Sequence, residues 1–100
     1  MKIRLLCEAA KELDEACLWY EEQVSGLGYS FLNAIDEAVD RIRLYPFSSE
    51  VAHDDLRKCS LKRFPFQIIY GLQEGMIVIV AVAHMKRLPV YWEDRWGGSQ

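Results

Sequence analysis

Apolar residues follow a helical period in the first half of the chain and an extended pattern in the second half. Across residues 8–24 they recur at steps of three and four, while charged side chains, including Glu12 and Glu21, fill the other face. This spacing predicts an amphipathic helix of about four turns. The same period across residues 27–42 predicts a second helix, which Pro46 should end at Tyr45 or just before it.

Ser25 and Gly26 separate the two helical segments. Glycine is favoured just past a helix end because it enters the left-handed region at little steric cost. Two helices joined by so short a link must pack antiparallel, as a hairpin. Their apolar sides then form one seam, which we expect to be buried against a sheet.

Three consecutive antiparallel strands are predicted within residues 57–84, the stretch around which the rest is organised. Residues 76–83 form an uncharged run rich in β-branched side chains, which is typical of a strand buried on both faces. Residues 73–75 are a turn signal before it, and Pro65 should mark a strand start or an edge bulge because it lacks an N–H. A short strand is also predicted over residues 2–7.

The remaining segments are predicted as a polar loop over residues 46–55 and a short C-terminal tail after His84. His53 in that loop is interpreted as a solvated surface residue. The whole predicts one α+β domain over residues 1–100, in the order β-α-α-β-β-β. The helical hairpin packs on one side of a small antiparallel sheet, and the other side is expected to be left for another macromolecule.

Composition narrows the class of protein. Apolar residues make up 51% and charged residues 27%, as in ordinary soluble globular domains. The N-terminus lacks the apolar core of a secretory signal, and no apolar run reaches the roughly 20 residues that a bilayer requires, so we expect a cytoplasmic protein with no membrane partner. Three cysteines without C-x-x-C spacing predict free thiols, with no metal site and no cofactor.

Charge is divided unevenly along the chain. Residues 1–50 carry 5 Lys and Arg against 10 Asp and Glu, whereas residues 51–100 carry 7 against 5. The halves therefore have net charges of −5 and +2, which together give the −3 of the whole chain. One interpretation is two solvated helix faces. The other is a basic sheet-and-tail surface that faces an anionic partner.

The tail combines basic and aromatic residues of the kinds enriched at binding hot spots. The candidates for binding a target are Lys86, Arg87, Tyr91, Trp92 and Arg95. A structural alternative is that Val90, Tyr91 and Trp92 cap the open face of the sheet, and both roles can hold together. His84 at the end of the last strand is a candidate general base, or a structural histidine that bonds to a neighbouring loop.

Four pieces of sequence, in this order, resemble the RelE/ParE superfamily of type II toxin–antitoxin toxins, and they span nearly the whole chain. The first piece is the end of the first helix, residues 19–23 (WYEEQ), followed by residues 26–28 (GLG) and 31–32 (FL). The second is the end of the second helix, residues 38–42 (AVDRI) with Pro46, and the third lies in the sheet, residues 56–57 (LR), 63–66 (RFPF) and 68–70 (IIY). The fourth is the last strand and the tail, residues 81–84 (AVAH), 86–87 (KR), Pro89 and residues 91–92 (YW). The likeness is greatest to the ParE-type branch, often described as plasmid stabilisation proteins.

The RelE branch implies a ribosome-dependent mRNA endonuclease, with the ribosome and mRNA as partners. Such cleavage requires a deprotonated 2′-OH, a stabilised phosphorane and a protonated leaving oxygen. Lys58, Arg87 and Tyr91 resemble residues of that branch, and the candidate catalytic residues of a rearranged site are Arg57, Lys58, Arg63, Arg87 and Tyr91. Gln67 and Ser60, however, stand where that branch has basic residues, and the acidic composition does not favour binding to a polyanion.

The ParE branch implies poisoning of DNA gyrase, which requires a binding surface rather than catalytic residues, so the resemblance favours a protein that is not an enzyme. Both branches imply a cognate antitoxin, whose partly disordered segment would lie along the sheet edge or the helical hairpin. A homodimer and a toxin–antitoxin hetero-oligomer are both possible assemblies. A decayed toxin that only binds its antitoxin is the remaining alternative.

Overall fold

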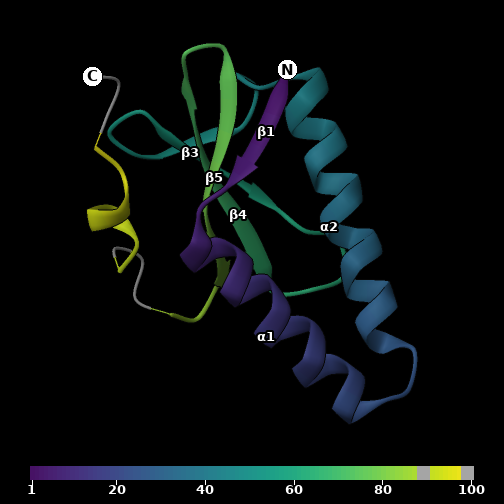
Figure 1. The fold of residues 1–100 in the computed structure, drawn as a ribbon. Helices are drawn as coiled ribbons and strands as arrows, with labels where there is room; N and C mark the ends of the chain where they lie inside the picture. The colour runs from purple at the N-terminus through teal and green to yellow at the C-terminus, as the bar shows by residue number, and fades with distance from the viewer. Residues whose placement is uncertain (88–90, 98–100) are drawn as a thin grey trace.

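Five strands form one sheet with two helices on one side of it (Figure 1). The computed structural model describes residues 1–87 and 91–97. Along the chain the elements are β1 (Lys2–Leu5), α1 (Cys7–Gln23), α2 (Leu27–Leu44), β2 (Glu50–His53), β3 (Leu56–Ser60), β4 (Phe66–Gln73), β5 (Met76–His84) and the 3₁₀ helix η1 (Glu93–Arg95). The predicted α+β class and the three antiparallel strands β3, β4 and β5 are confirmed.

The sheet is larger and more mixed than the sequence predicts. Its strand order is β1-β5-β4-β3-β2, and β1 pairs parallel to β5 while the other neighbours are antiparallel. The prediction of a polar loop over residues 46–55 is wrong for Glu50–His53, which form the edge strand β2. Val51 is 52% exposed there, and Ala52 is the one apolar side chain of this edge strand that packs against the core.

The helical hairpin agrees with its prediction. Gly26 adopts a φ of +91° between the helices, and α2 ends at Leu44, two residues before Pro46. Glu21 departs from the expected solvated face, since its carboxylate accepts hydrogen bonds from the backbone N–H groups of Gly26 and Gly28, each at 2.9 Å. One side chain therefore satisfies two amides at the start of α2, where no helical partner exists.

The strand β5 lies at the centre of the sheet, between β1 and β4, and its residues 77–83 are all buried. Ile69 pairs with Ala81 but Tyr70 pairs with Ile79, so Val80 is an extra residue in β5. This β-bulge places Val80 and Ala81 in the same core cluster, on the face away from the helices. On the helix side, Phe31 and Phe64 pack ring to ring with Tyr20.

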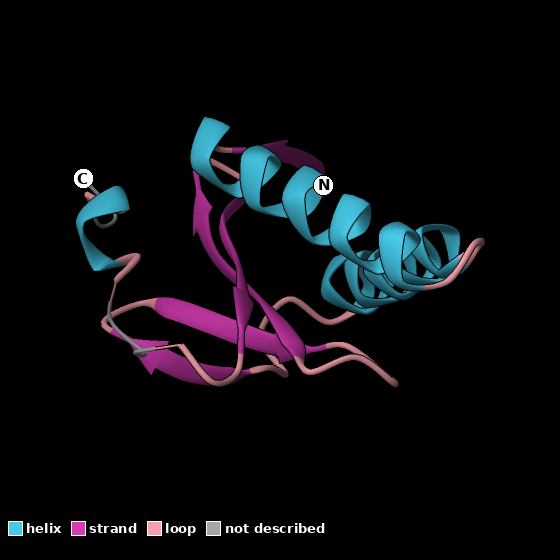
Figure 2. Ribbon diagram, turned by 90° about the horizontal axis from the view of Figure 1, so that it is seen from below, coloured by secondary structure: helices cyan, strands magenta, loops and turns pink. Residues whose placement is uncertain are grey.

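The second face of the sheet is closed by the tail, which corrects the expectation that it is left open. Trp92 is only 3% exposed and belongs to a buried cluster with Leu56, Ile69 and Val80. Trp96 lies directly over Gly71, where a Cβ would stand 2.5 Å from the indole. Figure 2 shows the two helices on one side of the sheet and the tail on the other.

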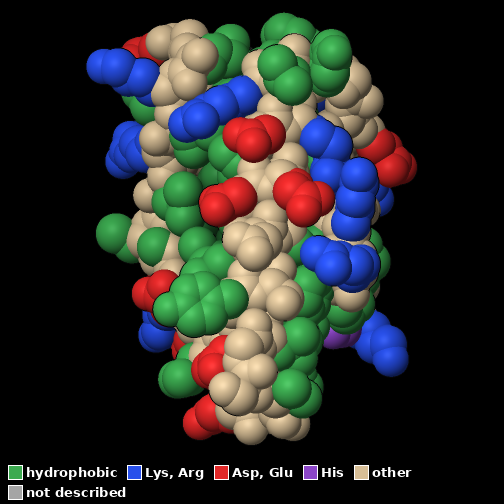
Figure 3. Space-filling view, turned by 90° about the vertical axis from the view of Figure 1, so that its right-hand side faces the viewer, with side chains coloured by type: hydrophobic (Ala, Val, Ile, Leu, Met, Phe, Trp, Pro, Cys, Tyr) green, Lys and Arg blue, Asp and Glu red, His purple; other side chains and the backbone are tan. Residues whose placement is uncertain are grey.

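Acidic side chains occupy the solvent face of α2, where Asp36, Glu37 and Asp40 are exposed. Figure 3, which looks onto this helix, shows acidic groups along its middle with Lys and Arg gathered beside them. The interpretation of solvated helix faces therefore holds for α2. Within the described ranges, no helix is long and apolar enough to cross a membrane.

Candidate functional site

A groove of about 520 Å³ runs between α1, the end of β5 and the tail. We call it the tail groove; it is lined by Glu12, Glu15, Ala16, Trp19, Tyr20, Pro65, Phe66, Val82, His84, Arg87 and Tyr91. It forms because β1 pairs with β5 only as far as Ile79, after which the chain turns into α1, and no strand of the described residues pairs with the rest of β5 on that side. The groove thus follows the edge of β5 beyond the end of β1, and aromatic side chains form part of its wall.

Glu12 is the junction of the three elements around this groove. Its carboxylate accepts hydrogen bonds from the Val82 N–H at 3.0 Å, the Tyr91 hydroxyl at 2.9 Å, and both terminal nitrogens of Arg95 at 2.9 and 3.0 Å. Arg95 also donates to the Val80 carbonyl at 3.1 Å. Backbone groups that the bulge and the end of β1 leave at the edge of β5 are therefore satisfied by side chains from α1 and the tail.

Burial makes this network a strong one. The Glu12 and Arg95 side chains are only 13% and 16% exposed. Paired fork to fork, an Arg and a carboxylate combine charge with two aligned hydrogen bonds. The hydrogen bond to Glu12 is the largest influence that raises the pKa of Arg95 above its ordinary value.

Tyr91 remains protonated through the physiological range. Burial, followed by the hydrogen bond to Glu12 and its negative charge, raises the pKa of Tyr91 to about 12. Its hydroxyl therefore donates to Glu12 and is no proton acceptor. The guanidinium of Arg87 lies 3.9 Å from the centre of the Tyr91 ring, and that of Arg95 lies 5.1 Å from it, both within cation–π range.

The five predicted target-binding residues do not share one exposed surface. Lys86 and Arg87 are exposed, and Tyr91 is half-buried beside them. Trp92 is buried against the sheet, and Arg95 is paired with Glu12. Trp92 thus caps the sheet face, as the structural alternative has it. Pro89 and Val90, which were part of the sequence argument, lie outside the described residues. The part of these residues in binding a target stays a prediction.

The five nuclease candidates are not brought together. Arg57 projects toward the helix side of the sheet, where it donates to the carbonyls of Phe47 and Ser49 at 2.9 and 2.7 Å. Lys58, its neighbour on β3, faces the opposite side and lies 3.8 Å from Glu50.

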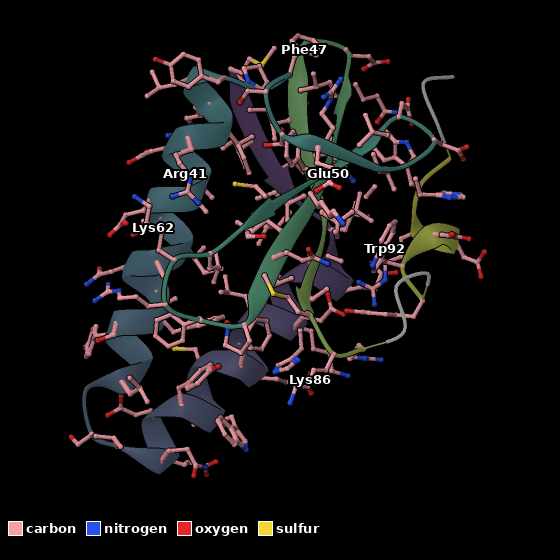
Figure 4. The ribbon with its side chains drawn as sticks, turned by 180° about the vertical axis from the view of Figure 1, so that it is seen from behind. Arg41, Phe47, Glu50, Lys62, Lys86 and Trp92 are labelled. Carbon is pink, nitrogen blue, oxygen red and sulfur yellow. The ribbon has the colours of Figure 1, made fainter. Side chains whose placement is uncertain are left out.

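Arg63 is exposed in the β3–β4 loop with a φ of +70°. Figure 4 shows Phe47, which Arg57 contacts, at the top of the molecule and Lys86, the neighbour of Arg87, well below it in the lower half. The side chains of Arg87 and Tyr91, by contrast, are in contact.

Both histidines are held by neighbouring groups. The Nδ1 of His84 accepts the Lys86 N–H at 3.0 Å, and its ring packs edge-on against Phe66, which is the structural role that we weighed for it. His53 is more than a solvated residue, because its Nδ1 lies 3.2 Å from the Glu93 carboxylate and its ring faces Trp92. It therefore ties β2 to η1.

Glu12 is the site residue that the sequence argument missed, since it was assigned to the polar face of α1. A signal was present: Glu12 lies three residues after Ala9 and four before Ala16, and both alanines are buried. Helical spacing therefore places it beside the buried stripe. Within residues 1–87 and 91–97, no group of three or more His, Cys, Asp or Glu residues is arranged to hold a metal ion.

A protein family and a solved structure are similar to this chain. The chain matches, over residues 3–89, the sequence model of the family described as the ParE toxin of the type II toxin–antitoxin system parDE. A solved structure of the chromosomal ParDE toxin–antitoxin system from P. aeruginosa is similar to it with a TM-score of 0.62 at 18% identity, covering 86% of this chain and 97% of that chain. At this identity the likeness concerns the fold. No curated protein matches the chain.

Proposed function

The chain belongs to the ParE toxin family of type II toxin–antitoxin systems, and from this we propose that it acts by binding and poisoning DNA gyrase rather than by cutting RNA. Its proposed regulator is a cognate ParD antitoxin. The observation that carries this proposal is the separation of the candidate catalytic side chains: Arg57 and Lys58 face opposite sides of the sheet, and Arg87 and Tyr91 contact each other at the tail groove.

An RNA-cleaving site requires a base, an acid and a phosphorane-stabilising cation that converge on one phosphate. In this chain Arg57 donates hydrogen bonds to two backbone carbonyls, and the protonated hydroxyl of Tyr91 donates a hydrogen bond to the Glu12 carboxylate. The Nδ1 of His84 already accepts a backbone N–H. A binding function requires no such convergence, and it is compatible with every one of these contacts.

The tail groove offers what a protein partner would bind. Arg87 is exposed and, among the described residues, has no carboxylate within ion-pair distance. Trp19, 56% exposed, contributes an apolar surface across the groove from it. Tyr, Trp and Arg dominate binding hot spots, so we propose that Arg87, Tyr91 and Lys86 contact an acidic and apolar patch of gyrase.

The test measures two effects of the toxin, inhibition of gyrase and cleavage of translated mRNA. Purified toxin should block gyrase supercoiling and accumulate cleaved DNA, and Arg87→Ala should lose most of this effect. Arg43→Ala, an exposed arginine at the end of α2, is the matched control and should retain it. Translated messages, mapped by primer extension on ribosomes, should remain intact. Ribosome-dependent cleavage that Arg87→Ala abolishes would overturn the proposal.

A further inference from the structure

A series of contacts links Arg87 to Glu12, a largely shielded residue of α1. Arg87 itself is exposed, and its guanidinium lies 3.9 Å from the centre of the Tyr91 ring. The hydroxyl of Tyr91 in turn donates to Glu12 at 2.9 Å. A continuous series of contacts therefore joins a fixed carboxylate inside the protein to an exposed cation at the mouth of the tail groove.

Glu12 is well suited to hold its neighbours in place. Both carboxylate oxygens are used, one by the Val82 N–H and Arg95, the other by Tyr91 and Arg95. A glutamine offers one acceptor oxygen and would present an NH₂ group to the second Arg95 nitrogen, which is also a donor. The charge and the two oxygens together are therefore required for the arrangement of Tyr91 and Arg95.

We propose that Glu12 is a positioning residue, which acts through Tyr91 to present Arg87 to the protein target. That this target is gyrase rests on the proposed function, whereas the placement of Arg87 by Glu12 does not. Trp19, on the α1 wall of the groove, lies seven residues after Glu12, about two helical turns, so the same helix carries one binding wall and orients the other.

The first experiment measures the placement of Arg87 without any partner. In proton NMR of the whole protein, the side-chain protons of Arg87 should be shifted upfield by the Tyr91 ring. Glu12→Gln should remove most of that shift, whereas Glu22→Gln, the same change at an exposed site of α1, should leave it. Tyr91→Phe removes only the hydrogen bond to Glu12 and should reduce the shift partly, so it carries the test if Glu12→Gln does not fold. Unchanged Arg87 signals in the folded variants would overturn the proposal.

The second experiment is a double-mutant cycle on binding to purified gyrase. Glu12→Gln should weaken binding about tenfold in the wild-type background and less than about twofold in the Arg87→Ala background. Glu22→Gln should stay within about twofold in both. Equal losses from Glu12→Gln in the two backgrounds would mean that Glu12 does not act through Arg87. Absence of gyrase binding by the wild-type protein would refute the proposed function, and the NMR comparison would still decide whether Glu12 places Arg87.

Discussion

The contact between Gly71 and Trp96 predicts that Gly71→Ala destabilises the protein, although the backbone of Gly71 is not in the left-handed region. A Cβ at Gly71 would lie 2.5 Å from Cζ2 and 2.7 Å from Cη2 of Trp96. Carbon atoms in contact are normally about 3.5–4.0 Å apart, so the indole would have to withdraw by about 1 Å. Such a movement would also strain or break the hydrogen bond that the Trp96 Nε1–H donates to Asp55 at 2.7 Å.

Two opposing effects set the magnitude. Gly→Ala in a strain-free position stabilises a protein by about 0.4–1 kcal/mol, since it lowers the entropy of the unfolded chain. Overpacking costs about 1–3 kcal/mol. The expected net loss is about 1–2 kcal/mol, which lowers the midpoint of urea unfolding, followed by circular dichroism, by about 1 M.

The sign should reverse when the tryptophan is removed. In a Trp96→Ala background the clash is gone, so Gly71→Ala should stabilise by about 0.5 kcal/mol. Gly97→Ala is the matched control, because a Cβ there would meet nothing within 4 Å. If Gly71→Ala raised the stability of the otherwise wild-type protein, the tail would not lie on β4 as described.

Three further outcomes follow from the network and the hairpin. Glu12→Ala leaves Arg95 and the Val82 N–H without their acceptor and should lower the free energy of unfolding by about 3 kcal/mol, whereas Asp14→Ala, at an exposed position of the same helix, should change it little. Glu21→Ala removes the acceptor of the Gly26 and Gly28 N–H groups, so it should lower the free energy of unfolding, measured by thermal unfolding, by about 1 kcal/mol. An effect no greater than that of Glu22→Ala would contradict this role. Folding raises the pKa of Tyr91 from 10.0 to about 12, so its neutral hydroxyl contributes fully to the stability of the fold below pH 10. This contribution is lost as the pH rises through about 12. The difference in unfolding free energy between wild type and Tyr91→Phe should therefore shrink over that window, and a difference that grew would refute the protonated hydroxyl.

The local elements were predictable from the sequence because their signals are local. The period of apolar residues defines α1 and α2, Gly26 and Pro46 define where they end, and the uncharged run of β5 indicates a central strand. The strand β2 was missed because its residues carry no such local signal. Ala52 is the one apolar side chain of β2 that packs against the core, and a single such position does not distinguish a strand from a loop.

The candidate site was only partly predictable. The tail was identified by its basic and aromatic composition, and the contact of Arg87 with Tyr91 agrees with their pairing in the sequence argument. The opposite orientations of Arg57 and Lys58 follow from their adjacent positions on one strand, so spacing alone could have separated them. The position of Arg63 in the β3–β4 loop depends on where β3 ends, at Ser60.

The sequence by itself determined which segments are helical or extended and which faces must be buried, since a side chain's preference for water acts at each position separately. Only the tertiary structure decided what covers each face. The bulge at Val80, within a uniformly apolar run, and the bonds that Glu12 makes with residues 70 to 83 positions away depend on how distant segments meet. That meeting turns a glutamate on an amphipathic helix into the junction of the sheet edge and the tail.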